Sequence, residues 1–252
     1  MLVDTHCHLF FEPLLSRIEG VLSRASHRGV EKIVVPAFDP ASWTAVRDLA
    51  RPGHIYPALG VHPWVADKPH SINVLADRLT EIGAVAVGEI GLDFKVAVPR
   101  EVQLSVFESQ LHLAADLGLP VLLHVRGAFE EMVDLLTRCT PRPRGVVHAF
   151  SRGPELAKRF LDLGLYIAFG GAITHERARR ARRAALKVPL DSVLLETDAP
   201  SIGLDGVAPV DVEPSHTADV AAALASIRVE SINTIAEVTT QNAFRLFGFD
   251  NS

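Results

Sequence analysis

The feature that most constrains the fold is a short apolar run that recurs eight times along the chain, with a helical pattern after each run. Most of these runs consist of aliphatic or β-branched residues without polar alternation. Near-continuous apolar runs of this length suit parallel strands that are covered on both faces. The runs occupy residues 2–3, 32–35, 55–59, 84–87, 121–123, 145–147, 165–169 and 192–195.

The segments between the runs predict helices. Residues 99–117 give the clearest pattern, because Leu104, Phe107 and Leu111 recur at helical spacing before Gly118 ends the helix. Two further helices are expected at residues 154–163 and 231–247. Strands that alternate with helices predict an α/β fold, a (β/α)₈ TIM barrel, with a doubly wound open sheet as the rival. The length fits one barrel, so we expect a single domain over residues 1–252.

Residues that can ionise or bind a metal stand where six of the eight expected strands end. In a barrel, the carboxyl ends of all strands meet on one face, where active sites lie. Ionisable residues at so many strand ends are unusual in an apolar core. The pattern therefore favours the barrel over the open sheet and predicts a metal-binding or active site at the carboxyl ends of the strands. The residues are His6 and His8, His62, Glu89, His124, His148, and Glu196 with Asp198.

The first of these strand ends reads DTHCHLF, residues 4–10. Successive side chains of a strand point to opposite faces, so His6 and His8 are expected to point the same way and Cys7 the other. The two histidines can then share one metal ion. Cys7 is expected to pack under a helix, since a buried free cysteine usually behaves as a small apolar residue.

The candidate ligands are more numerous than one metal ion requires, which predicts two divalent ions bridged by a carboxylate. Glu89 is the expected bridge, because its strand lies between the two histidine clusters in chain order. A single strand-end histidine is more often a hydrogen-bonded core or rim residue than a ligand, but the HxH spacing and the ring change that balance. One ion would take His6, His8, Glu89 and Asp198; the other would take Glu89, His124 and His148. Four histidines favour zinc, manganese, nickel or cobalt over magnesium.

Several of these segments also resemble a known family. DTHCHL, GVHPW, VGEIGLD, HAF and ETDAP are similar, in order and spacing, to motifs of the TatD family of metal-dependent hydrolases. Within that family, GVVHAFS and GGAIT resemble the YjjV-like branch, and the match covers roughly residues 1–248. The resemblance implies an amidohydrolase-like TIM barrel, one or two metal ions on the same six ligands, and deoxyribonuclease activity, often assayed with magnesium.

Two departures from the family pattern concern the substrate contacts. Phe10 stands where members often carry an acidic or amide residue. The segment after ETDAP, SIGLDGVAPVDVEP, contains no Lys or Arg and keeps only Glu213 and Pro214 of the usual pattern. This loop is therefore not expected to grip phosphate.

The expected chemistry is metal-assisted hydrolysis of a phosphodiester. The resemblance implies DNA as the substrate. Asp198 is the candidate general base, or a ligand only, and Glu89 is the bridge at the reacting centre. His62 would either donate a hydrogen bond to phosphate or orient a ligand. Arg126 would either bind phosphate or form an ion pair at the rim.

Two other functions remain open from the sequence. The same barrel and metals suit an amide, lactone or other ester hydrolase. Many such sites are bridged by a carbamylated lysine, and the absence of strand-end lysines favours the phosphodiester. The second alternative is a non-catalytic metal-binding protein.

The net charge of −5 argues against a broad basic surface for duplex DNA. Five arginines within residues 177–183 are expected to be a solvated helix face or a phosphate patch.

Cysteine usage and hydropathy bear on the compartment. Two cysteines make no disulfide framework, so a reducing cytoplasm is expected. We see no signal segment and no run of about 18 apolar residues, so no membrane association is expected. Nothing in the sequence implies a protein partner, and a monomer is favoured.

Overall fold

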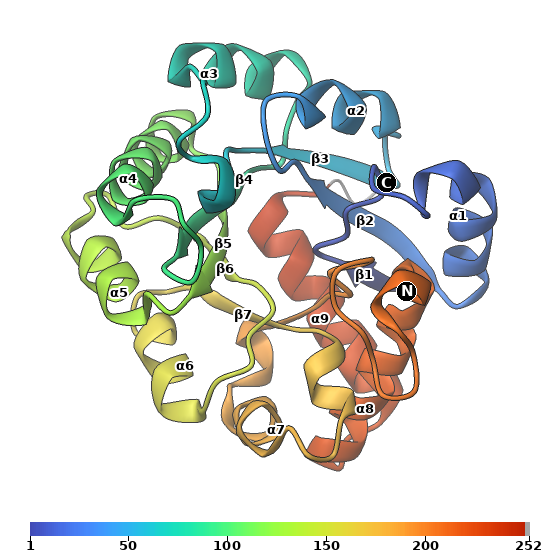
Figure 1. Cartoon of the computed structure of the whole chain (residues 1–252). Helices are drawn as coiled ribbons and strands as arrows, with labels where there is room; N and C mark the ends of the chain where they lie inside the picture. The colour runs from blue at the N-terminus through green and yellow to red at the C-terminus, as the bar shows by residue number, and fades with distance from the viewer. Residues whose placement is uncertain (250–252) are drawn as a thin grey trace.

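The computed structural model describes residues 1–249 and contains eight parallel strands in the order β1 to β8. Figure 1 shows the strands at the centre with the helices arranged around them. The fold is therefore the predicted barrel and not a doubly wound open sheet. The strands are β1 Leu2–Asp4, β2 Val30–Pro36, β3 Ile55–Leu59, β4 Ala86–Asp93, β5 Val121–Arg126, β6 Gly145–Val147, β7 Tyr166–Phe169 and β8 Val193–Leu195.

The helices between the strands form the outer layer. Their bounds are α1 Ile18–His27, α2 Ser42–Leu49, α3 Ile72–Glu81, α4 Arg100–Leu117, α5 Phe129–Arg138, α6 Pro154–Leu161, α7 Arg179–Lys187, α8 Thr217–Arg228 and α9 Ile232–Phe247. The three helices expected at residues 99–117, 154–163 and 231–247 are α4, α6 and α9. In the part of the chain that the structure describes, none of the helices combines the length and hydropathy needed to span a membrane. The prediction of one domain over residues 1–252 includes residues 250–252, which lie outside the described residues.

The interior of the barrel is filled by one small or branched residue from each strand. This layer packs against Ala243, Leu246 and Phe247 of α9, so α9 closes the amino-terminal end of the barrel. The layer consists of Val3, Val34, Ala58, Ala86, Leu122, Val146, Ala168 and Leu194. With one end closed by apolar packing, the carboxyl end is the place for a site.

Strands β1 and β8 are joined by residues that follow them. Cys7 and Ala199 form a parallel bridge. The backbone N–H of Asp198 donates to the carbonyl of His6 at 2.8 Å, and that of Thr5 donates to Leu195 at 3.0 Å. The same backbone contacts that join these strands therefore fix the positions of His6 and Asp198.

Strand β4 differs from the sequence prediction, which ended it at residue 87 and placed Glu89 at its end. The strand runs to Asp93, and its pairing with β5 shifts register between Val87 and Ile90. Ala86 lies in the interior layer, so strict alternation would turn Glu89 outward toward the helices. The irregularity turns Glu89 inward instead, as β-bulges beside active sites commonly do.

Candidate metal centre

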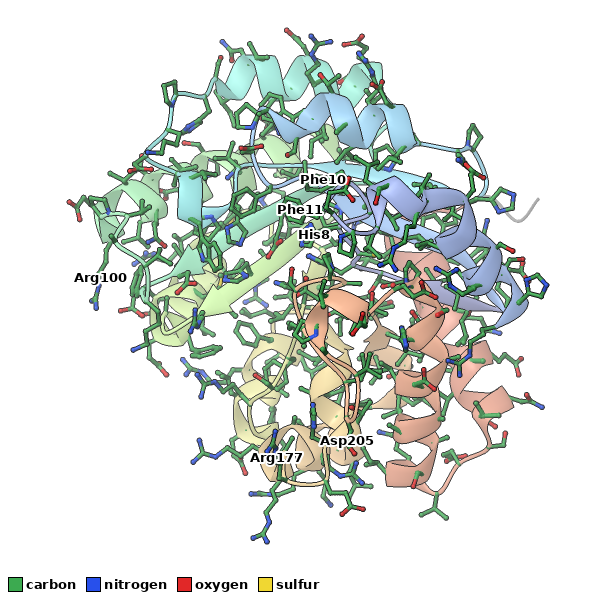
Figure 2. The ribbon with its side chains drawn as sticks, turned by 45° about the vertical axis from the view of Figure 1, so that its right-hand side comes forward. His8, Phe10, Phe11, Arg100, Arg177 and Asp205 are labelled. Atoms are coloured by element: carbon green, nitrogen blue, oxygen red, sulfur yellow. The ribbon has the colours of Figure 1, made fainter. Side chains whose placement is uncertain are left out.

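All six predicted ligands come together at the carboxyl end of the barrel. Five of them are buried, and the side chain of His124 is 16% exposed. Figure 2 shows His8 near the centre of the molecule, below Phe10 and Phe11. The nitrogen and oxygen atoms of the six ligands, together with those of His62, fall into three overlapping groups. Within each group, one such atom per residue lies within 4.8 Å of the others. The groups are His6, Glu89 and His148; His6, His8 and Asp198; and His62, Glu89 and His124.

Glu89 lies at the centre of the cluster, and its two oxygens face different histidines. Oε2 lies 3.2 Å from Nε2 of His6 and 3.5 Å from Nε2 of His8. Oε1 lies 2.9 Å from Nδ1 of His124 and 2.8 Å from Nε2 of His148. The carboxylate therefore separates the cluster into two halves.

Asp198 completes the half that contains His6 and His8. Its Oδ1 lies 3.4 Å from Nε2 of His8, and the Nε2 atoms of the two histidines are 3.3 Å apart. Asp198 has a φ of 52°, in the left-handed region that non-glycine residues seldom adopt. Such strain is typical of positions that the surrounding structure holds for function.

Three rings have an oxygen atom on the side that faces away from the cluster. Nδ1 of His8 lies 3.1 Å from the carbonyl of Pro36. Nε2 of His124 lies 3.5 Å from Oδ2 of Asp93, and Nδ1 of His148 lies 3.8 Å from Oε1 of Glu196. Such partners fix the tautomer and orientation of histidines that bind metals. Only the His8 contact is a hydrogen bond; the Asp93 and Glu196 carboxylates lie beyond hydrogen-bond distance of their rings. In this arrangement Nε2 of His8 and His148, and Nδ1 of His124, face the cluster.

Burial and neighbouring charges set the protonation of the cluster. Burial, with repulsion from His148, lowers the pKa of His6 to about 4. Burial also disfavours charge on His124, but attraction to Asp93 and Glu89 outweighs it and raises its pKa to about 9. Burial favours the neutral acid of Glu89, but the surrounding histidines outweigh this effect and hold its pKa well below the ordinary value. At neutral pH the cluster therefore contains an ionised carboxylate and a proton on His124, which a metal ion would replace.

A second buried network holds the backbone beneath the cluster. Oγ1 of Thr197 donates to Oδ2 of Asp4 at 2.6 Å, and the Thr197 N–H donates to Oδ1 at 3.0 Å. The His6 N–H also donates to Oδ1 of Asp4, at 3.2 Å. Asp4 therefore links the segment carrying His6 to the segment carrying Asp198.

Two carboxylates in the cluster were not assigned a role from the sequence. Asp93 is fully buried at the end of β4 and contacts His124. Glu196 is buried beside His148 and accepts from the Ala149 N–H at 2.5 Å. Asp93 is the last residue of the motif VGEIGLD, and Glu196 is the first residue of ETDAP. Neither motif shows which histidine the carboxylate contacts.

The remaining predicted site residues lie at the rim of the cluster. Nε2 of His62 is 3.3 Å from Oε1 of Glu89, so this ring joins the half of the cluster with His124. Nη1 of Arg126 is 3.8 Å from Oδ2 of Asp93, and its side chain is 59% exposed. This places Arg126 in an ion pair at the rim, with most of its side chain open to solvent.

Three other features have structural positions. Cys7 is buried in the apolar layer between barrel and helices, as the alternation predicted. Glu213 forms a bidentate ion pair with Arg24, with contacts of 2.8 Å and 2.7 Å, and so ties its loop to α1. In the arginine-rich segment, Arg182 donates to the Ile173 carbonyl, and Figure 2 shows Arg177 far from His8 at the lower edge of the molecule.

The fold and the cluster define a TIM-barrel metal-dependent hydrolase, with buried histidines and carboxylates able to bind metal at the carboxyl ends of the strands. The chain belongs to the TatD family: residues 3–248 match the family described as TatD related DNase.

Known proteins agree with this assignment. The chain is 39% identical to the uncharacterized metal-dependent hydrolase YjjV of Escherichia coli, with 97% of each protein covered. It is 35% identical to the 3′-5′ ssDNA/RNA exonuclease TatD of Yersinia pseudotuberculosis, with 90% of this chain and 92% of that protein covered. The crystal structure of YjjV, a TatD homolog, superposes with a TM-score of 0.91 over 99% of this chain and 98% of that chain.

Proposed function

We propose that the cluster binds two divalent metal ions and hydrolyses phosphodiester bonds of DNA. The observation that carries the proposal is the position of Glu89, whose two oxygens face separate sets of histidines within 3.5 Å. One carboxylate between two sets of ligands is the arrangement of a bridged two-metal site. The relative named as an ssDNA/RNA exonuclease supports a nucleic-acid substrate.

The donor set fits divalent ions. The buried Nε2 atoms of His6 and His8 lie 3.3 Å apart, so both could bind the same ion. The first ion would be held by His6, His8, Glu89 and Asp198, and the second by Glu89, His124 and His148. Imidazole and carboxylate ligands suit zinc, manganese or nickel, and magnesium is the alternative on oxygen ligands. His62 lies beside the second set and would orient the substrate or a ligand.

Bound divalent ions supply Lewis acidity and lower the pKa of water from 15.7 to about 7. The residues of the chain supply position and proton transfer. Asp198 has a depressed pKa because its histidine neighbours outweigh the effect of burial, so its carboxylate is ionised at neutral pH and can accept a proton from the attacking water. The exposed Arg126 guanidinium can approach a phosphate oxygen and match it with two hydrogen bonds.

The test begins with removal of metals by a chelator, followed by separate addition of Mn²⁺, Mg²⁺ or Zn²⁺. End-labelled single-stranded DNA and bis(4-nitrophenyl) phosphate are then assayed together. We expect metal-restored cleavage of both, and a loss of at least about 100-fold in Asp198→Asn because a positioned proton acceptor is removed. Asparagine tolerates the left-handed backbone of Asp198, so this variant should keep its fold.

Asp205→Asn is the matched control, because Asp205 is 69% exposed in the loop beside His175. It should retain full activity. Metal binding without cleavage of either phosphodiester would overturn the proposed reaction, and aryl esters, lactones and amides would be tested next. A ladder that shortens from one end would identify an exonuclease.

Cys7 and Cys139 are free and buried, which supports the cytoplasm as the proposed compartment.

A further inference from the structure

Four aromatic side chains form a continuous surface on one side of the candidate metal centre. We call this surface the aromatic wall: Phe10, Phe11, Phe38 and Trp64, from the segments that follow β1, β2 and β3. Ring centroids are 4.3 Å apart for Phe10 and Phe11, 6.3 Å for Phe11 and Phe38, and 6.1 Å for Phe38 and Trp64.

The aromatic wall is more exposed than folding explains. Phe11 and Trp64 are 36% and 46% exposed, and they are the aromatic members of the large exposed apolar side chains of residues 1–249. A large apolar ring is favourably buried during folding, so an exposed pair beside a polar site points to a ligand. By contrast, rings at the centre of the core, such as Phe107 and Phe160, are fully buried.

The wall is joined directly to the metal centre. The ring of Phe11 lies 5.4 Å from that of His8, and Phe38 stacks on His62 at 4.7 Å. Figure 2 shows Phe10, Phe11 and His8 close together at the centre of the view. A group that is covalently attached to a phosphate in the cluster would therefore lie against these rings.

The indole of Trp64 is held in place. Its Nε1 donates to Oδ2 of the fully buried Asp93 at 2.7 Å, and its ring lies edge-on to His62 at 5.3 Å. A fixed aromatic face loses little conformational freedom when a flat ligand stacks on it. The wall is therefore a preorganised platform.

We infer that the aromatic wall is a stacking subsite for an unpaired nucleobase next to the scissile phosphate. This inference rests on the proposed phosphodiesterase function and adds a substrate class to it. Every base offers a π-face, so stacking on aromatic side chains tolerates all sequences but requires the base to be unpaired. With divalent ions bound, the cluster would attract the anionic phosphate, and the apolar wall would contact the base. The two parts of the site therefore match the two parts of a nucleotide.

The test compares two substrates that differ only in the base. Thymidine 5′-(4-nitrophenyl phosphate) and its abasic analogue carry the same leaving group and sugar. With the metal-loaded protein, we expect kcat/KM to be about tenfold higher for the thymidine ester, in line with the strength of one stacked base. Phe11→Leu keeps an apolar side chain but removes the ring, so this ratio should fall toward one. Leu186→Ala, at a 47% exposed position on α7, is the control and should keep the wild-type ratio.

A binding measurement separates this inference from the proposed reaction. Trp64 is exposed and Trp43 is buried, so a stacked base should quench mainly the fluorescence of Trp64. Thymidine 5′-monophosphate should quench it and ribose 5-phosphate should not, and Phe11→Leu should weaken the quenching several-fold.

The outcomes of the two proposals differ. Cleavage of both esters at equal rates, without quenching, overturns the stacking subsite and leaves phosphodiester hydrolysis intact. If neither ester is cleaved, the proposed reaction is overturned. In that case, quenching by thymidine 5′-monophosphate but not by ribose 5-phosphate would still support the stacking subsite. If the nucleotide does not quench either, the stacking subsite is overturned as well.

Discussion

Asp93 and His124 lie near the carboxyl ends of the neighbouring strands β4 and β5, with Oδ2 of the carboxylate 3.5 Å from Nε2 of the ring. The other ring nitrogen, Nδ1, faces Glu89 at 2.9 Å. His124 is thus held between two carboxylates, one within the proposed centre and one behind it. This arrangement orients the ring and makes it a better donor to a metal ion.

Asp93→Asn tests the role of this outer carboxylate. The amide cannot hold the charge and orientation of His124 in the same way, so the affinity for Mn²⁺ should fall about 10- to 100-fold. The affinity is measured by competition with a chelator at pH 9, near the pKa of His124, where the proton competes less than at neutral pH. Asp205→Asn should bind Mn²⁺ as the wild type does. Equal affinity in both variants would show that Asp93 has no part in metal binding.

The two halves of the cluster predict two different losses of metal. His8 faces only Oε2 of Glu89, so His8→Ala should reduce the bound metal from two ions to about one per chain, while Glu89→Ala should weaken both ions. Metal content after desalting is measured by mass spectrometry. If Glu89→Ala retained as much metal as His8→Ala, Glu89 would not bridge the two halves.

Metal affinity should depend on pH through His124. The ring has a pKa of about 9 without metal, so its proton must leave before the nitrogen can bind an ion. Lowering the pH from 9 to 6 should therefore weaken binding by about tenfold per pH unit. Calorimetry in buffers of different ionisation enthalpy should detect about one proton released at neutral pH. A flat profile over this range would contradict the protonation assigned to His124.

Gly91 allows the close approach of β4 to β5. It has a φ of 143°, and a Cβ at this position would collide with the carbonyl of His124. Gly91→Ala should therefore lower the free energy of unfolding by about 3 kcal/mol or more and displace His124. Gly118→Ala is the matched control: Gly118 also has a positive φ but open space around it, so about 1 kcal/mol is expected. Urea denaturation measures both, and similar losses would show that the contact with His124 is unimportant.

The sequence predicts most of this fold for physical reasons. Parallel strands covered on both faces must be apolar, so their positions are visible as apolar runs, and the residues that follow them fall together in any barrel. The same reasoning places His124 and His148 at the site, because each follows an inward-facing residue of its strand by two positions, Leu122 and Val146.

Other parts of the site depend on features that a single sequence does not show. The irregularity in β4 reverses the direction of Glu89, and no residue pattern in VGEIGLD specifies that shift. The contact of Asp93 with His124 depends on the continued pairing of β4 with β5 beyond the apolar run. The exposure of Phe11 and Trp64 depends on how the segments that follow β1, β2 and β3 pack at the carboxyl end of the barrel.

The number and positions of the bound ions can be measured by anomalous scattering from crystals of the protein grown with Mn²⁺. We predict two peaks about 3.5–4 Å apart, one on each side of the Glu89 carboxylate. The first peak should be bound by His6, His8 and Asp198, and the second by His124 and His148. A single peak, or peaks that do not share Glu89, would contradict the bridged two-metal centre.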